Sequence, residues 1–128
     1  MRAVLTFCLG IGWLFATLPA VSHHSFAAEF DVNRPIELTG AITRVELTNP
    51  HAWIYLDVEG DDGGVENWGI ELLGVNTLYR RGWRRDTLQP GDLVSVTGFG
   101  SRDGRARGNA SSVTRADTGE LLWESAAP

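Results

Sequence analysis

Apolar and polar residues alternate along most of the chain, in short runs that are typical of β-strands. The alternation is clearest over His51–Val58, where Ile54 and Leu56 would share one face and Trp53 and Tyr55 the other. The turn-forming residues 61–64 connect this run to a return strand, so a hairpin is expected here. Further strands are expected over residues 36–47, 65–73, 93–99, 109–115 and 120–123.

One segment between these strands has the features of a short helix. Asn76 is a suitable N-cap, and Gly82 is a suitable terminator after the apolar and basic residues that follow Asn76. Trp83 is expected to fold back onto the core. Three strands, a short helix and two more strands form the order of the OB-fold. We therefore predict an all-β fold, a small Greek-key barrel of about five strands over residues 36–124, with a strand-rich sandwich as the main rival.

The start of the chain has a different pattern, which is typical of a secretory signal. Met1-Arg2 is followed by an uncharged, strongly apolar run to Leu18, then by Pro19 and the small residues Ala20 and Ser22. The run is shorter than the roughly twenty apolar residues of a spanning helix, which argues against a membrane anchor. The expected domains are a cleaved signal 1–22, an N-terminal segment 23–35, the barrel, and a loose tail 125–128. A cut after Ala20 is a second option.

Composition narrows the range of functions. The single cysteine, Cys8, lies in the signal, so the mature chain is expected to have neither a disulfide nor a thiol nucleophile. Without Arg2, ten arginines face sixteen acidic residues, which gives a net charge of −6. An acidic, exported protein is a poor nucleic-acid binder, because that binding depends on neutralising phosphates. We expect a periplasmic or secreted protein without a membrane span in its mature form.

The three histidines are the strongest candidates for chemistry. His23 and His24 would stand at the new N-terminus, and His51 follows the Asn49-Pro50 turn. Imidazoles and a terminal amine are good ligands for copper and other divalent metals. A cut after Ser22 would make His23 a chelating first residue, and a cut after Ala20 would make it the third residue of a square-planar site. The alternatives are a solvated N-terminal His-His pair and a His51 ring bonded to a backbone carbonyl, and Asp31 or Glu29 could pair with either.

Two other surfaces are candidates for binding. Trp53 and Tyr55 would stack on a planar ligand if their face of the barrel were exposed. The alternatives are that the N-terminal segment, through Phe26 and Phe30, covers them as a lid, or that the barrel faces the other way. A basic cluster at Arg80, Arg81, Arg84 and Arg85 suits an envelope partner or a solvated helix face. No catalytic motif is visible, so binding is a better expectation than catalysis.

Four ordered motifs resemble one uncharacterised bacterial family of small exported proteins, the domain of unknown function 6152. They are residues 23–31, 46–54, 80–83 and 88–92. The resemblance implies a secreted or periplasmic single-domain protein and implies no activity. All three histidines fall within these motifs, which favours a joint role for them.

These observations lead to one main hypothesis and two alternatives. The main hypothesis is a periplasmic OB-fold protein that binds copper, or another divalent metal, through its mature N-terminus and His23, His24 and His51. The first alternative is an accessory domain that holds another envelope protein and has no metal. The second is a copper oxidase or oxygenase, which would need an open coordination position at the same site.

Overall fold

The computed structural model describes residues 26–125. The predicted signal, His23, His24 and the last three residues lie outside this part of the chain. None of the described helices is long and apolar enough to cross a membrane. The elements in chain order are α1 (Phe26–Glu29), β1 (Phe30–Glu46), β2 (Trp53–Glu59), β3 (Val65–Glu71), α2 (Val75–Arg80), β4 (Leu93–Ser101), β5 (Arg107–Arg115) and β6 (Leu121–Glu124).

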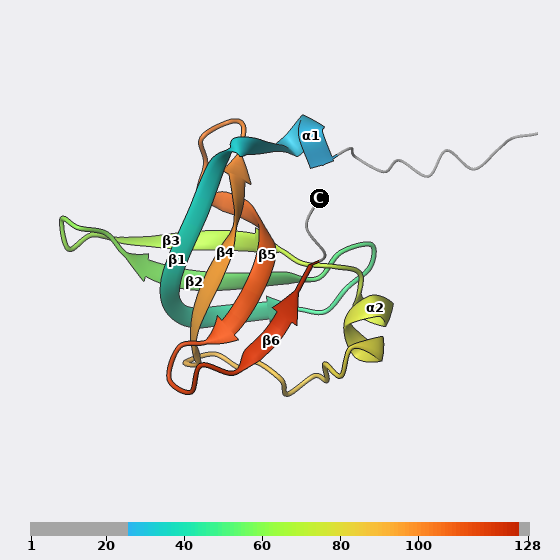
Figure 1. Ribbon diagram of the computed structural model, residues 1–128. Coiled ribbons are helices and arrows are strands. Elements are labelled where there is room, and N and C mark those ends of the chain that lie inside the picture. Colours follow the sequence, from blue (N-terminus) through green and yellow to red (C-terminus); the bar gives the residue numbers. More distant parts are fainter. Residues whose placement is uncertain (1–25, 126–128) are drawn as a thin grey trace, which may run out of the picture.

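The strands form one sheet that curls back on itself (Figure 1). Neighbouring strands pair antiparallel in the order β3-β2-β1-β4-β5-β6. β3 and β5 also pair, in parallel, and this contact closes a ring through Gly69↔Arg107, Ile70↔Gly108 and Glu71↔Asn109. The predicted all-β class is confirmed, as is the helix between the third and fourth strands.

Two details of the predicted barrel are corrected. There are six strands rather than five, because β6 pairs with β5 as a further strand outside the ring. The closure is also narrow, at three residue pairs, so the sheet is a ring rather than a regular barrel. Pairing between β3 and β5 joins segments far apart in the sequence, and no local pattern determines its length.

β1 is the longest strand and connects the two halves of the ring. It pairs with β4 over Pro35–Ala41 and with β2 over Gly40–Glu46. The predicted start at Ile36 is wrong, because the strand already begins at Phe30. The polar run before Pro35 hides this extension in the sequence, whereas the burial of Phe30 and its pairing with Ser101 reveal it.

α2 lies close to its expected place, but its first turn is built differently. The helix begins at Val75 after an N-cap at Gly74, and no side chain caps it, so the predicted cap at Asn76 is wrong. Gly82 follows the helix with a φ of 99°, the left-handed conformation expected of a terminating glycine. The chain then turns inward at Trp83.

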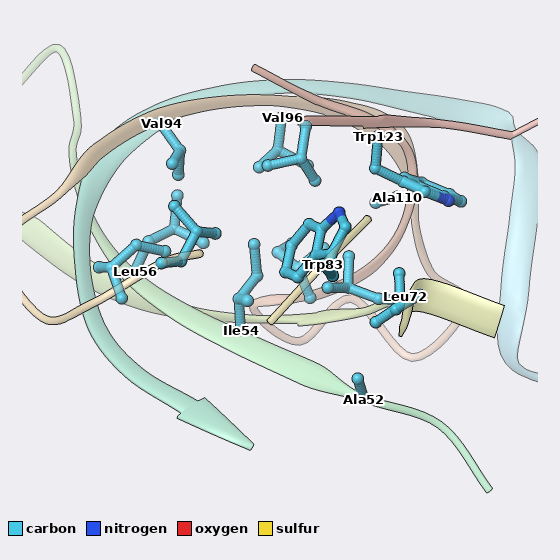
Figure 2. Close-up of a cluster of buried hydrophobic side chains, with 14 of the residues drawn as sticks. Ala52, Ile54, Leu56, Leu72, Trp83, Val94, Val96, Ala110 and Trp123 are labelled. Carbon is cyan, nitrogen blue, oxygen red and sulfur yellow. The ribbon is translucent and has the colours of Figure 1, made fainter. Parts of the chain in front are cut away.

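The core occupies the inside of the ring, and Trp83 lies at its centre (Figure 2). Figure 2 shows its ring among Ile54, Leu72 and Val96, side chains that come from different strands and the loop after β3. The indole Nε1 donates a hydrogen bond of 2.8 Å to the carbonyl of Leu122, which ties the loop after α2 to β6. The predicted inward fold of Trp83 is confirmed, and Ile54 and Leu56 face the core as expected.

Candidate functional site

His51 lies just before β2. The next residue, Ala52, holds it there through two backbone hydrogen bonds to residues that follow β3. Ala52 donates to the carbonyl of Leu73 and accepts from the amide of Leu72, at 3.0 and 2.8 Å. The Asn49-Pro50 turn packs against Gly74, where an added Cβ would lie 2.8 Å from the carbonyl oxygen of Pro50. The backbone that carries His51 is therefore closely constrained.

The imidazole of His51 pairs with the carboxylate of Glu71. The Nδ1–H of His51 donates to Oε1 of Glu71. The Glu71 side chain is 7% exposed, whereas the ring of His51 is 46% exposed. In a neutral imidazole, donation from Nδ1 leaves the lone pair on Nε2. His51 is therefore oriented by a buried partner while its other nitrogen is left to act as an acceptor or a ligand.

Glu71 is an unusual group in this sheet, because few carboxylates are so deeply buried. Burial raises the pKa of Glu71, the positive charge of His51 opposes that rise, and the negative charge of Glu29 adds to it. Glu29 lines the same pocket as Arg107, and Arg107 pairs with Gly69, two residues before Glu71. The end of α1 and the His51–Glu71 pair thus belong to the same region.

α1 is anchored firmly at this place. The guanidinium Nε of Arg102 donates to the carbonyl of Ala27 at 2.6 Å, and its backbone amide donates to the carbonyl of Glu29 at 2.9 Å. The ring of Phe26 packs against Phe30 and Phe99, at centroid distances of 5.5 and 5.8 Å. Figure 1 shows α1 beside the turn between β4 and β5, where Arg102 lies. The point from which the chain continues back toward His24 is consequently well defined.

Of the three predicted metal ligands, only His51 lies in the described part of the chain. Over residues 26–125 there is no group of three histidine, cysteine, aspartate or glutamate side chains that would hold a metal ion. The carbonyl, Asp31 and Glu29 considered as partners of His51 are replaced by Glu71, which the sequence analysis missed. The only sequence signal was its position opposite Trp53 in the predicted hairpin, and the exact register follows from the structure.

Trp53 and Tyr55 lie on the outer face of β2, as the alternation predicts. Their rings stack at a centroid distance of 6.5 Å with 25° between the planes. Arg107 lies over Trp53 at 4.7 Å and Arg44 over Tyr55 at 3.9 Å. Burial and then the negative charge of Glu46 raise the pKa of Tyr55.

Phe26 and Phe30 do not form the lid considered as an alternative for these rings. Phe26 and Phe30 pack against each other, and Phe26 packs against Phe99 on β4. The lid was inferred from apolarity alone, and apolarity does not say which surface a segment covers. The aromatic face of β2 is lined instead by arginine side chains.

The basic cluster near α2 makes hydrogen bonds to its own loop and to β6. Arg81 donates to the carbonyl of Glu124 at 2.8 Å, and Arg84 donates to the carbonyls of Tyr79 and Trp83 at 3.1 and 2.6 Å. Arginines that satisfy the last carbonyls of a helix stabilise its C-terminal end. These contacts give the cluster a structural role, and its binding of an envelope partner stays a prediction.

Comparison with known proteins adds a family to this geometry. The model of a family of unknown function (DUF6152) matches residues 13–111. The chain belongs to this family. The matched segment includes His23, His24, His51, Glu71 and Arg107, so the whole candidate region lies within the family domain. No curated protein matches the chain. Membership of this family implies no particular activity, so the evidence for function comes from the residues of the site.

Proposed function

We propose that this is an exported metal-binding protein whose site combines the mature N-terminus, His23, His24 and His51, with copper as the preferred metal. The observation that supports it most is the hydrogen bond from His51 Nδ1 to the buried Glu71. Metal-binding histidines commonly donate their second N–H to a carboxylate, which fixes the ring and raises its basicity. A histidine that is simply solvated does not require a buried carboxylate to orient its ring.

The anchored position of α1 also supports this proposal. His24 and His23 precede Phe26 by two and three residues, so backbone of at most about 7 and 10 Å separates them from it. α1 itself is a single turn, and its last residue acts electrostatically on Glu71. This short tether and the anchored α1 support a site that the N-terminal histidines share with His51.

Export is the second part of the proposal, and it comes from the sequence. The apolar run and the small residues before His23 are typical of a cleaved signal. Cleavage would create a free amine beside His23, and amine and imidazole together favour Cu(II) or Ni(II). The cleavage position therefore determines the coordination geometry, and an N-terminal tag would remove one of the ligands.

The test is a Cu(II) titration of protein processed by its own export machinery, with intact mass measured before and after metal addition. We expect one copper per chain, and at least a tenfold loss of affinity in both His51→Ala and His23→Ala. Asn67→Ala, an exposed change on the neighbouring strand, is the control and should bind like the parent. Equal affinity in the parent and in a His23→Ala, His51→Ala double variant would refute the site.

A further inference from the structure

A small pocket opens on the outer face of the ring, beside the stacked rings of β2. Its volume is about 290 Å³, and it is lined by Trp53, Tyr55, Asn67, Gly69, Ala106 and Arg107. None of these residues belongs to the proposed metal site. The volume is at the lower end of the range for small-molecule sites, which fits a ligand about the size of one substituted ring.

The pocket exists because one position on β3 has no side chain. Gly69 faces the two rings, and a Cβ added there would lie 3.2 Å from Cε1 of Tyr55 and 3.9 Å from Cε3 of Trp53. Any larger residue would fill the space between β3 and the aromatic pair. The floor of the pocket is therefore backbone, with apolar ring surface beside it.

The two arginines next to these rings differ in how their charges are satisfied. Arg44 over Tyr55 forms an ion pair with Glu46 at 2.7 Å. The guanidinium of Arg107 over Trp53 makes no ion pair or side-chain hydrogen bond with any residue in 26–125. A guanidinium lying over an indole points its N–H groups outward in its own plane. Arg107 consequently offers guanidinium N–H groups without a side-chain hydrogen-bond partner in residues 26–125, at the rim of an apolar pocket, although its charge acts on Glu71 and Asp103.

We infer that this pocket binds a small organic carboxylate with a flat, apolar body. The ring surface of Trp53 and Tyr55 suits the flat body, and the edge of Arg107 suits the carboxylate in a bidentate pair. A phosphate dianion fits less well, because a single guanidinium would have to balance two charges. The charge of Arg107 already acts to lower the pKa of Glu71, and repulsion from this carboxylate would be greater for a dianion than for a monoanion. This inference is independent of the proposed metal site.

The experiment uses chelator-treated full-length mature protein, so that no metal contributes. Benzoate is the probe, and benzamide is its neutral analogue of the same shape. Binding is followed by NMR through the indole N–H of Trp53 and the amide of Gly69. We expect benzoate to bind with a Kd on the order of millimolar and benzamide at least about tenfold more weakly. Equal binding of the two probes would overturn the inference.

Two substitutions locate the binding. Arg107→Gln should weaken benzoate about tenfold, whereas Arg105→Gln, which removes the same charge two residues earlier, should leave it unchanged. Gly69→Ala should weaken benzoate and benzamide alike by filling the pocket. Thermal melting of each variant verifies folding. Benzoate binding that is indifferent to Arg107→Gln, or phenyl phosphate binding tenfold tighter than benzoate, would overturn the assignment.

Discussion

His51 and Glu71 form a carboxylate–histidine pair across the β2–β3 hairpin, with an exposed ring on a buried acid. The acid fixes the ring's orientation and leaves Nε2 available. Burying a carboxylate costs free energy that burying an apolar residue would not, and within residues 26–125 the side-chain hydrogen-bond partner of Glu71 is His51. The pairing is therefore the most informative contact in the molecule, and it leads to the first prediction.

Removing the carboxylate should weaken metal binding although it touches no metal. Glu71→Leu should lower Cu(II) affinity by about 10- to 100-fold, the usual cost of losing an outer partner of a ligating histidine. Glu71→Gln retains an acceptor for Nδ1, so its loss should be smaller. Glu66→Gln, an exposed change on the same strand, is the control. Isothermal titration of the three variants measures this, and parent-like affinity in Glu71→Leu would contradict the role assigned to Glu71.

The anchoring of α1 should matter for the N-terminal ligands. Arg102→Gln removes the 2.6 Å bond to the carbonyl of Ala27 and should loosen the segment that precedes Phe26. We expect faster proteolysis near α1 and weaker Cu(II) binding, with the melting temperature little changed. Arg80→Gln, which removes an exposed guanidinium from α2, serves as the control. If copper affinity were the same in Arg102→Gln and the parent, the position of α1 would not contribute to the site.

The turn between β4 and β5 should be sensitive to acid through Asp103. The pKa of this carboxyl is lowered, first by the hydroxyl of Ser101, which donates at 2.7 Å, and then by the amide of Arg105. A carboxyl with a lowered folded-state pKa stabilises the fold above its unfolded pKa, and the gain is lost as the pH falls through the folded value. The free energy of unfolding should thus fall between about pH 5 and pH 2.

Asp103→Asn tests this pH dependence. The variant should be less stable than the parent at pH 7, and the two should converge in strong acid. Asp117→Asn, in an exposed turn, should change stability little at either pH. Urea unfolding at a series of pH values measures the difference, and a constant gap between Asp103→Asn and the parent from pH 7 to pH 2 would exclude a titrating role for Asp103.

The fold should depend strongly on Trp83, the residue at the centre of the ring. Trp83→Ala should destabilise the protein by about 3–5 kcal/mol, because it leaves a large cavity. Trp83→Phe keeps most of the apolar volume but leaves the carbonyl of Leu122 without its hydrogen bond. We therefore expect the free energy of unfolding to fall by about 1–3 kcal/mol. Denaturant unfolding gives both values. An effect below about 1 kcal/mol for Trp83→Ala would show that the ring relaxes around the missing side chain.

Much of the fold was readable in the sequence, because strands and short helices have local signals. Alternation determined which face of β2 turns inward, and the apolar Trp83 after Gly82 indicated its return to the core. The start of β1 at Phe30 was not readable. It depends on pairing with Ser101, a residue far along the chain, and local polarity opposed it.

The candidate site, too, was predictable from the sequence only in part. The sequence identified His51, Trp53 and Tyr55 through residue type and spacing, but it assigned none of their partners. Glu71 reaches His51 only because β2 and β3 pair in one particular register. Arg107 reaches Trp53 only because β5 closes the ring against β3 in parallel.

The sequence by itself determined the succession of strands and identified the candidate metal ligands and the expected export signal. These are properties of residue type and local order. The tertiary structure decided which carboxylate orients His51, and it also decided which guanidinium stands beside the aromatic pair. Strand register and ring closure determine such partners. Both depend on the free energy of the whole sheet, so a short stretch of sequence does not reveal them.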